Sequence, residues 1–141
     1  MAKKIHRLKN LEPEIFKVVC IASHENDYKV SWSINEKLKI ILKRQENHKI
    51  PISKTDNYQE FLHYSYEDNN SQVNYHLLAN KSEQGFLIKD MPNIDYFLKI
   101  SGHLENISVP EVVHSLKEIP IIMTAFEMEN ITRVKHKRLS F

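Results

Sequence analysis

The sequence is poor in the two residues that many short functional motifs require, with one cysteine and two glycines in 141 residues. A single cysteine excludes an internal disulfide framework and any CxxC metal or redox site. Two glycines exclude a GxGxxG or P-loop phosphate cradle, which needs close approach of the backbone to the ligand. These absences remove the common nucleotide-binding and thiol-based classes of enzyme, and the sequence implies no cofactor and no catalytic residue.

Long apolar segments are also missing. The longest uninterrupted apolar run is 18–22, far short of the roughly 7 to 15 residues of a secretory signal core or the roughly 18 of a membrane-spanning helix. The composition, 41% hydrophobic and 27% charged, is that of one ordinary soluble domain covering 1–141. We therefore expect a cytoplasmic protein, with Cys20 reduced and buried in the core.

The small net charge of +2 conceals an uneven distribution of charge. Residues 11–130 carry 12 basic and 18 acidic side chains, a net charge of −6, whereas both ends are purely basic. The simplest interpretation is that the ends are flexible or fold back on the acidic body; the alternative is that they contact nucleic acid. The basic residues that would make such contacts are Lys3, Lys4, Arg7, Arg133, Lys135, Lys137 and Arg138.

The N-terminal half predicts a strand, a helix and a second strand. The β-branched run 16–22 is typical of a buried central strand. Residues 26–38 fit both strand alternation and helical i, i+4 spacing. We favour a helix because Ser23, Asn26 and Asp27 offer N-cap chemistry and Asn35-Glu36-Lys37 has no strand tendency. Residues 39–44 resemble the first strand, flanked by charge. The polar segments 45–57 and 80–84 are expected to be surface loops.

A hairpin is the clearest element of the sequence. Segments 60–67 and 72–80 are expected to be strands joined by Asp68-Asn69-Asn70-Ser71, because asparagine tolerates a tight type I′ turn. If Asp68 pairs with Ser71, one face of the hairpin is apolar and the other is mostly polar. The pairs expected on these faces are Leu62–Leu77, Tyr64–Tyr75 and Tyr66–Val73 on the first, and Phe61–Leu78, His63–His76 and Ser65–Asn74 on the second.

The last third predicts strand, helix and strand. Residues 94–101 alternate, Ser108 is a plausible N-cap for a helix with an apolar stripe at 112–119, and 121–126 form a final buried strand. The predicted fold class is α+β. It has an antiparallel sheet with two helices packed on one face and strand–helix–strand units at both ends around the central hairpin, related to the ferredoxin-like arrangement.

The segment Ile88-Lys89-Asp90-Met91-Pro92-Asn93-Ile94-Asp95-Tyr96 resembles the signature of the bacterial IPExxxVDY family. Ile88, Asp95 and Tyr96 match that signature, Ile94 stands for its valine, and Lys89 and Asp90 replace its proline and glutamate. The resemblance extends over most of the chain. It implies a fold and a cytoplasmic location, and it transfers no catalytic residue.

Two groups of residues are candidates for a site. His24 and Asp27 follow the first strand, where α/β ligand sites often form, and with Asp95 they are the candidate ligand-binding residues. His63 and His76 are predicted to face each other across the hairpin, but no third ligand stands at a fixed spacing, so no metal site is predicted.

The sequence favours a non-catalytic interaction or regulatory domain, forming a homodimer through its sheet or an edge strand. Because two helices cover only one face of a sheet, Phe61, His63, His76 and Leu78 are expected to lie at the interface. The second hypothesis is an RNA- or ribosome-associated protein that uses its basic ends. The third is a small-molecule sensor or enzyme at His24, Asp27 and Asp95. A protein partner is compatible with the first hypothesis, and none of the three involves a membrane.

Overall fold

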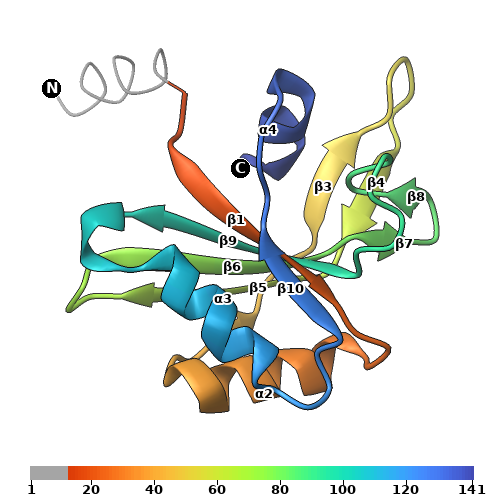
Figure 1. Cartoon of the computed structure of the whole chain (residues 1–141). Helices are drawn as coiled ribbons and strands as arrows, with labels where there is room; N and C mark the ends of the chain where they lie inside the picture. Colours follow the sequence, from red (N-terminus) through yellow and green to blue (C-terminus); the bar gives the residue numbers. More distant parts are fainter. Residues whose placement is uncertain (1–12) are drawn as a thin grey trace, which may run out of the picture.

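The computed structural model describes residues 13–141 and confirms an α+β fold on an antiparallel sheet (Figure 1). Within these residues, a six-stranded sheet has the order β10-β1-β9-β6-β5-β2, and the pairs β3–β4 and β7–β8 form two further small sheets. The strands are β1 (Phe16–Ala22), β2 (Lys43–Arg44), β3 (His48–Pro51), β4 (Tyr58–Phe61), β5 (His63–Asp68), β6 (Val73–Ala79), β7 (Lys81–Ser82), β8 (Gly85–Phe86), β9 (Tyr96–Gly102) and β10 (Thr124–Glu127). The helices are α2 (Asp27–Leu38), a 3-10 turn (Leu104–Asn106), α3 (Val109–Lys117) and α4 (Arg133–Leu139).

Helices α2 and α3 lie on the same face of the sheet, as predicted (Figure 1). Helix α3 connects β9 to β10, and both of these strands pair antiparallel with β1, which lies between them. β9 and β10 are therefore parallel, and α3 is the crossover of a split β–α–β unit. The hairpin β5–β6 stands between β9 and β2. Nothing in this order conflicts with the predicted relation to the ferredoxin-like arrangement.

Local capping determines where the first two helices begin. The Asn26 side chain accepts a hydrogen bond of 2.9 Å from the backbone N–H of Lys29, and Ser108 caps α3 in the same way. Val30 and Ile34 are buried one helical turn apart, so the helical spacing, and not the strand alternation, describes residues 27–38. Lys39 ends α2 in the left-handed conformation, with φ 58°.

The predicted hairpin forms, but its predicted register is wrong by two residues. Tyr64 pairs with Leu77, and Tyr66 pairs with Tyr75. The turn is longer than predicted because the Asp68 carboxylate accepts hydrogen bonds from the Asn70 N–H and the Ser71 hydroxyl, and Gln72 adopts φ 59°. A shift of two residues keeps every side chain on its predicted face.

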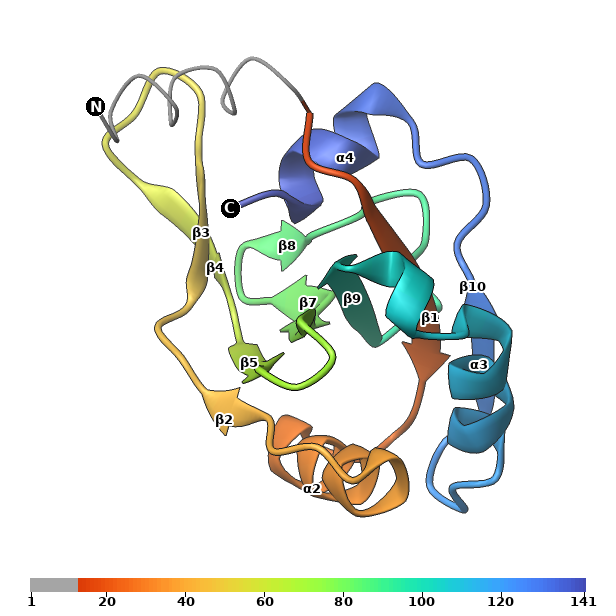
Figure 2. The same ribbon diagram turned by 90° about the vertical axis from the view of Figure 1, so that its left-hand side faces the viewer.

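The expectation that the second face of the sheet is uncovered is wrong. Helix α4, the β3–β4 hairpin and residues 87–94 lie on the side opposite α2 and α3 (Figure 1 and Figure 2). Phe61 and Leu78, which were expected at an interface, are both fully buried there. Residues 131–141, expected to be flexible or to fold back on the acidic body, contain α4, and Leu139 of this helix is fully buried.

Four predicted segments also differ from the structure. Of residues 39–44, only Lys43–Arg44 form a strand, because the backbone of Leu42 bonds to the side chain of Asn35 instead. The predicted loop 45–57 contains β3, and Asn80 of the predicted loop 80–84 is fully buried. The predicted buried strand 121–126 is β10, which lies at the edge of the sheet with Phe126 40% exposed.

Candidate functional site

His24 and Asp95 line one open cavity of about 400 Å³ at the ends of β1 and β9. The Asp95 carboxylate accepts a hydrogen bond of 2.9 Å from the Ser23 N–H and forms an ion pair of 2.9 Å with Lys81. Both of its oxygens are therefore engaged in joining β1, β7 and the start of β9. The residues around this cavity are Ser23, His24, Glu25, Leu62, Ala79, Lys81, Asp95 and Tyr96.

Asp27 is not among the residues that line this cavity. Its carboxylate accepts a hydrogen bond of 2.6 Å from the Tyr64 hydroxyl, which ties α2 to β5. Burial, together with that bond and the Asp27 charge, raises the pKa of Tyr64 to about 12. The Tyr96 hydroxyl similarly donates to the Glu25 carbonyl at 2.8 Å. Both phenols stay protonated at neutral pH and hold the helix against the sheet, so the structure brings together only two of the three predicted ligand residues.

The predicted contact between His63 and His76 exists, although the two residues are diagonal and not directly opposite. Nε2 of His63 and Nδ1 of His76 share a hydrogen bond of 3.0 Å, and the ring of Phe141 lies within 5 Å of both imidazoles. Burial, together with the nearby histidines, lowers the pKa of His63 to about 4 and that of His76 to about 3. Both side chains are neutral at pH 7. In residues 13–141, no group of three or more potential ligands is placed to hold a metal ion.

Lys99 is the polar residue that the sequence reasoning missed. Its side chain is fully buried on the second face, where Nζ forms an ion pair of 2.8 Å with Glu14 and lies over the rings of Phe16 and Phe141. Burial lowers its pKa. The alternation of β9 correctly places Lys99 on the same side as Phe97, but alternation alone does not reveal that this side is covered.

The C-terminal basic residues belong to α4, while Lys3, Lys4 and Arg7 lie outside the described residues. Arg138 donates from its guanidinium to the carbonyls of Leu87 and Phe86 and to Gln59. Lys135 lies 3.6 Å from the Asp90 carboxylate. Arg133 and Lys137 are exposed. Two of the four C-terminal residues predicted to contact nucleic acid therefore hold α4 against residues 86–90.

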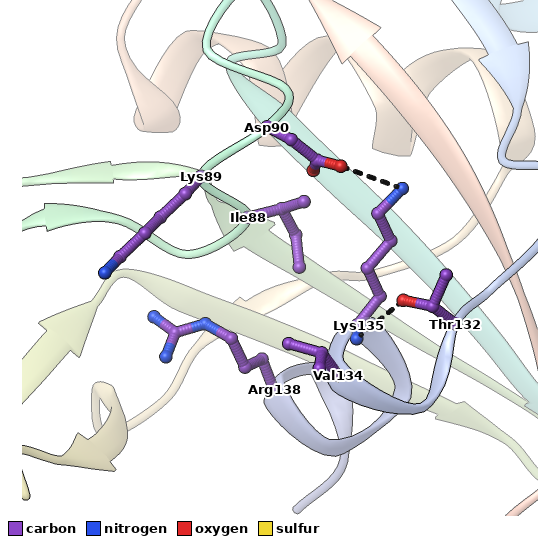
Figure 3. Close-up of a pocket in the computed structure, with 7 residues that line it drawn as sticks. All are labelled: Ile88, Lys89, Asp90, Thr132, Val134, Lys135 and Arg138. Carbon is purple, nitrogen blue, oxygen red and sulfur yellow. Dashed lines mark hydrogen bonds and ion pairs between the residues drawn. The ribbon is translucent and has the colours of Figure 1, made fainter.

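A cavity of about 290 Å³ lies between residues 88–90 and α4 (Figure 3). Three cations line it, together with one carboxylate, one hydroxyl and two aliphatic side chains. These residues are Lys89, Lys135, Arg138, Asp90, Thr132, Ile88 and Val134. No sequence motif indicated this cavity, because its two walls are more than 40 residues apart in the chain and meet only in the folded protein.

The segment 88–96, which carries the family resemblance, is held in place by Asn80. The Asn80 side chain donates to the carbonyls of Met91 and Ile94 at 2.9 and 2.8 Å and accepts from the Ile88 N–H at 2.8 Å. A buried amide that makes three hydrogen bonds fixes an irregular loop as firmly as a strand pairing does. In this segment, Ile88 donates its N–H to the Asn80 side chain, and the Asp95 carboxylate binds the Ser23 N–H and Lys81. Both residues therefore have a structural role.

Comparison of the chain with protein-family models, with curated proteins and with solved structures gave no match. The family relationship suggested by residues 88–96 therefore stays a prediction. Among residues 13–141, no helix has the length and apolar character needed to cross a bilayer.

Proposed function

We propose that this chain is a non-catalytic interaction domain of the cytoplasm that forms a homodimer by pairing β10 of one copy with β10 of a second. The observation that carries the proposal is the outer edge of β10, which pairs with no other strand within residues 13–141. An unpaired edge presents a row of N–H and C=O groups that a second strand can satisfy.

The backbone geometry identifies which residues present these groups. Met128 donates its N–H to the Val18 carbonyl, so even-numbered residues from 124 to 128 bond toward β1. Because the direction alternates along an antiparallel strand, the N–H and C=O groups of Ala125 and Glu127 point outward. Phe126 and Met123, at 40% and 60% exposure, provide apolar surface beside this edge.

Charge favours a second copy as the partner of this edge. Glu127 is the one charged residue of β10, and in a symmetric antiparallel pairing centred on Phe126 it lies opposite Ala125 of the second copy, so two β10 edges can meet without opposing like charges. The other edge of the sheet, β2, is two residues long and consists of Lys43 and Arg44, which is the usual protection of an edge strand against pairing. A symmetric β10–β10 contact is also closed, whereas a β10–β2 contact would propagate into a fibre.

Sedimentation equilibrium over a range of protein concentrations, with native mass spectrometry, tests the proposal. A four-residue edge is small relative to a standard interface, so we expect a dimer with a dissociation constant on the order of 10 μM. Glu127→Pro removes an outward N–H without removing a bond to β1 and should abolish the dimer. Glu127→Ala removes the same carboxylate, keeps the N–H, and should leave the dimer intact.

A second pair of variants separates the edge from general surface apolarity. Phe126→Lys should weaken the dimer at least tenfold, whereas Ile41→Lys, at another exposed apolar position, should not change it. A chain that remains monomeric at about 1 mM refutes the proposal. The dissociation constant of any dimer would then lie above about 1 mM, which is too weak for a specific interface. Co-purified oligonucleotide in the mass spectrum of a monomer would favour the RNA-associated alternative instead.

A further inference from the structure

The cavity between residues 88–90 and α4 has an excess of positive charge at its walls. Lys89, Lys135 and Arg138 line it, and Asp90 is the one acidic residue among its lining groups (Figure 3). Lys89 and Arg138 extend toward the same side of the cavity, and the Lys135 ammonium points to Asp90 (Figure 3). Such an arrangement attracts an anion.

Arg138 is the central cation of this cavity. All the bonds that its guanidinium makes in the described structure go to neutral oxygens, those of Leu87, Phe86 and Gln59. These bonds fix its orientation but do not neutralise its charge. Burial lowers the pKa of Arg138, yet an arginine remains charged at any physiological pH. A half-buried charge that is oriented but not neutralised is a preorganised anion contact.

The other two cations are only weakly neutralised. The Lys135 side chain is 18% exposed, and its partner Asp90, at 3.6 Å, is 72% exposed and hydrated. None of the ion pairs formed by residues 13–141 involves Lys89 or Arg138. The cavity therefore has the charge to bind a ligand that carries two negative charges.

We propose that this cavity binds a small phosphomonoester, with the phosphate held among Lys89, Lys135 and Arg138. Lys89 and Arg138 approach the phosphate from one side of the cavity, and Lys135 reaches it by turning away from Asp90. The Thr132 hydroxyl, which already accepts from the Lys135 N–H, can donate its own proton to a phosphate oxygen. Ile88 and Val134 offer apolar contact to the organic part of the ligand. The volume of about 290 Å³ is at the lower end for ligand pockets and limits the ligand to a small molecule.

NMR titration of the full-length, isotope-labelled chain with phenyl phosphate and with inorganic phosphate, at constant ionic strength, tests this site. Phenyl phosphate should produce saturable shifts of the backbone signals of Lys89 and of 132–135, with a dissociation constant on the order of 1 mM. Inorganic phosphate should shift the same signals with weaker affinity, because it makes no contact with Ile88 or Val134. Shifts that do not saturate, or that spread over all the exposed lysines, overturn the proposal.

Matched variants separate this cavity from the general basic surface of α4. Lys89→Gln should weaken phenyl phosphate binding about fivefold, since one charge-assisted contact is lost. Lys137→Gln removes the same charge from an exposed position of α4 outside the cavity and should leave the affinity unchanged. Equal weakening by the two variants overturns the proposal.

Removal of Asp90, the acidic residue of the cavity, should strengthen the binding of phenyl phosphate. Asp90→Asn frees Lys135 and removes a repulsion, so phenyl phosphate should bind about threefold more tightly. Asp56→Asn, on an exposed loop elsewhere, should have no effect. Weaker binding in Asp90→Asn would refute the proposed position of the phosphate. A single-stranded RNA that binds more tightly than phenyl phosphate, and is weakened equally by both lysine variants, would also refute it.

Discussion

The two faces of the central sheet are covered in different ways. On the first face, α2 and α3 supply apolar stripes that pack on β1, β6 and β9, and Ser31 is the one buried polar residue of these two helices. On the second face, the cover consists of residues 87–94, the short helix α4 and the β3–β4 hairpin. This second layer buries Lys99, His48 and Asn80 among its apolar residues.

The difference shows two means of covering a sheet. Regular helices bury aliphatic side chains and satisfy their own backbone groups, so the first face needs few buried polar side chains. Irregular segments have backbone groups without internal partners, so the second face requires polar side chains such as Asn80 to satisfy them. The cavity between residues 88–90 and α4 lies on the second face, where packing is least regular.

Truncating one core leucine on each face should have the largest effect and gives the most direct comparison. Leu116 of α3 and Leu139 of α4 are both fully buried. Leu116→Ala should lower the free energy of unfolding by about 3 to 4 kcal/mol, and Leu139→Ala by about 2 kcal/mol, since the short α4 can shift to fill part of the cavity. Urea denaturation measures both. A negligible effect of Leu139→Ala would mean that α4 does not cover the second face.

Loss of the Asn80 amide should have the next largest effect. Asn80→Ala leaves two buried carbonyls and one N–H of residues 88–94 without partners, and we expect the free energy of unfolding to fall by about 2 to 3 kcal/mol. Asn93→Ala, in the same loop but exposed, is the control and should change stability little. Hydrogen exchange of the Ile88 amide, which should accelerate in the first variant alone, identifies the loop as the part that loosens.

Mild acid should lower the free energy of unfolding through the histidine pair of the second face. This is the smallest of the three effects expected on stability. Folded His63 and His76 have pKa values lowered from 6.5 to about 4 and about 3, so the unfolded chain binds more protons below pH 6.5. Their stabilising contribution is present above pH 6.5 and is lost as the pH falls toward these folded values. We expect a loss of about 1 to 2 kcal/mol between pH 7 and pH 5, allowing for their partial exposure.

Urea denaturation of the wild type and of His76→Phe at both pH values checks this prediction. Phenylalanine cannot titrate, so the pH dependence should be smaller in this variant. An equal pH dependence in the two proteins would contradict the assignment of the acid sensitivity to the histidine pair.

Much of the first face could be predicted because its signals are local. The Asn26 and Ser108 caps, and the helical spacing of Val30 and Ile34, act within one or two turns of the chain. The assignment of residues to faces in the hairpin was also correct, because alternation is a property of each strand. The hairpin register was wrong because it depends on whether the Asp68 side chain stabilises a longer turn.

The candidate sites could be predicted only in part. His24 and Asp95 do line one cavity, although Asp95 also holds β1 and Lys81 in place. The cavity between residues 88–90 and α4 was not predicted, because Lys89 and Arg138 come from segments that have no common sequence pattern. The basic character of residues 133–138 is plain in the sequence, but their pattern did not indicate that Arg138 turns inward to the carbonyls of Phe86 and Leu87.

The sequence by itself determined the fold class, the positions of α2, α3 and β1, and the apolar side of the two hairpin strands. The tertiary structure decided the register of the β5–β6 hairpin, which segments cover the second face of the sheet, and the burial of Lys99 and Asn80. The physical reason is the range of the forces involved. Capping and periodicity act between near neighbours, whereas the bond from Ser23 to Asp95 joins residues 72 positions apart. Such a bond forms only when the packed core brings its two segments together.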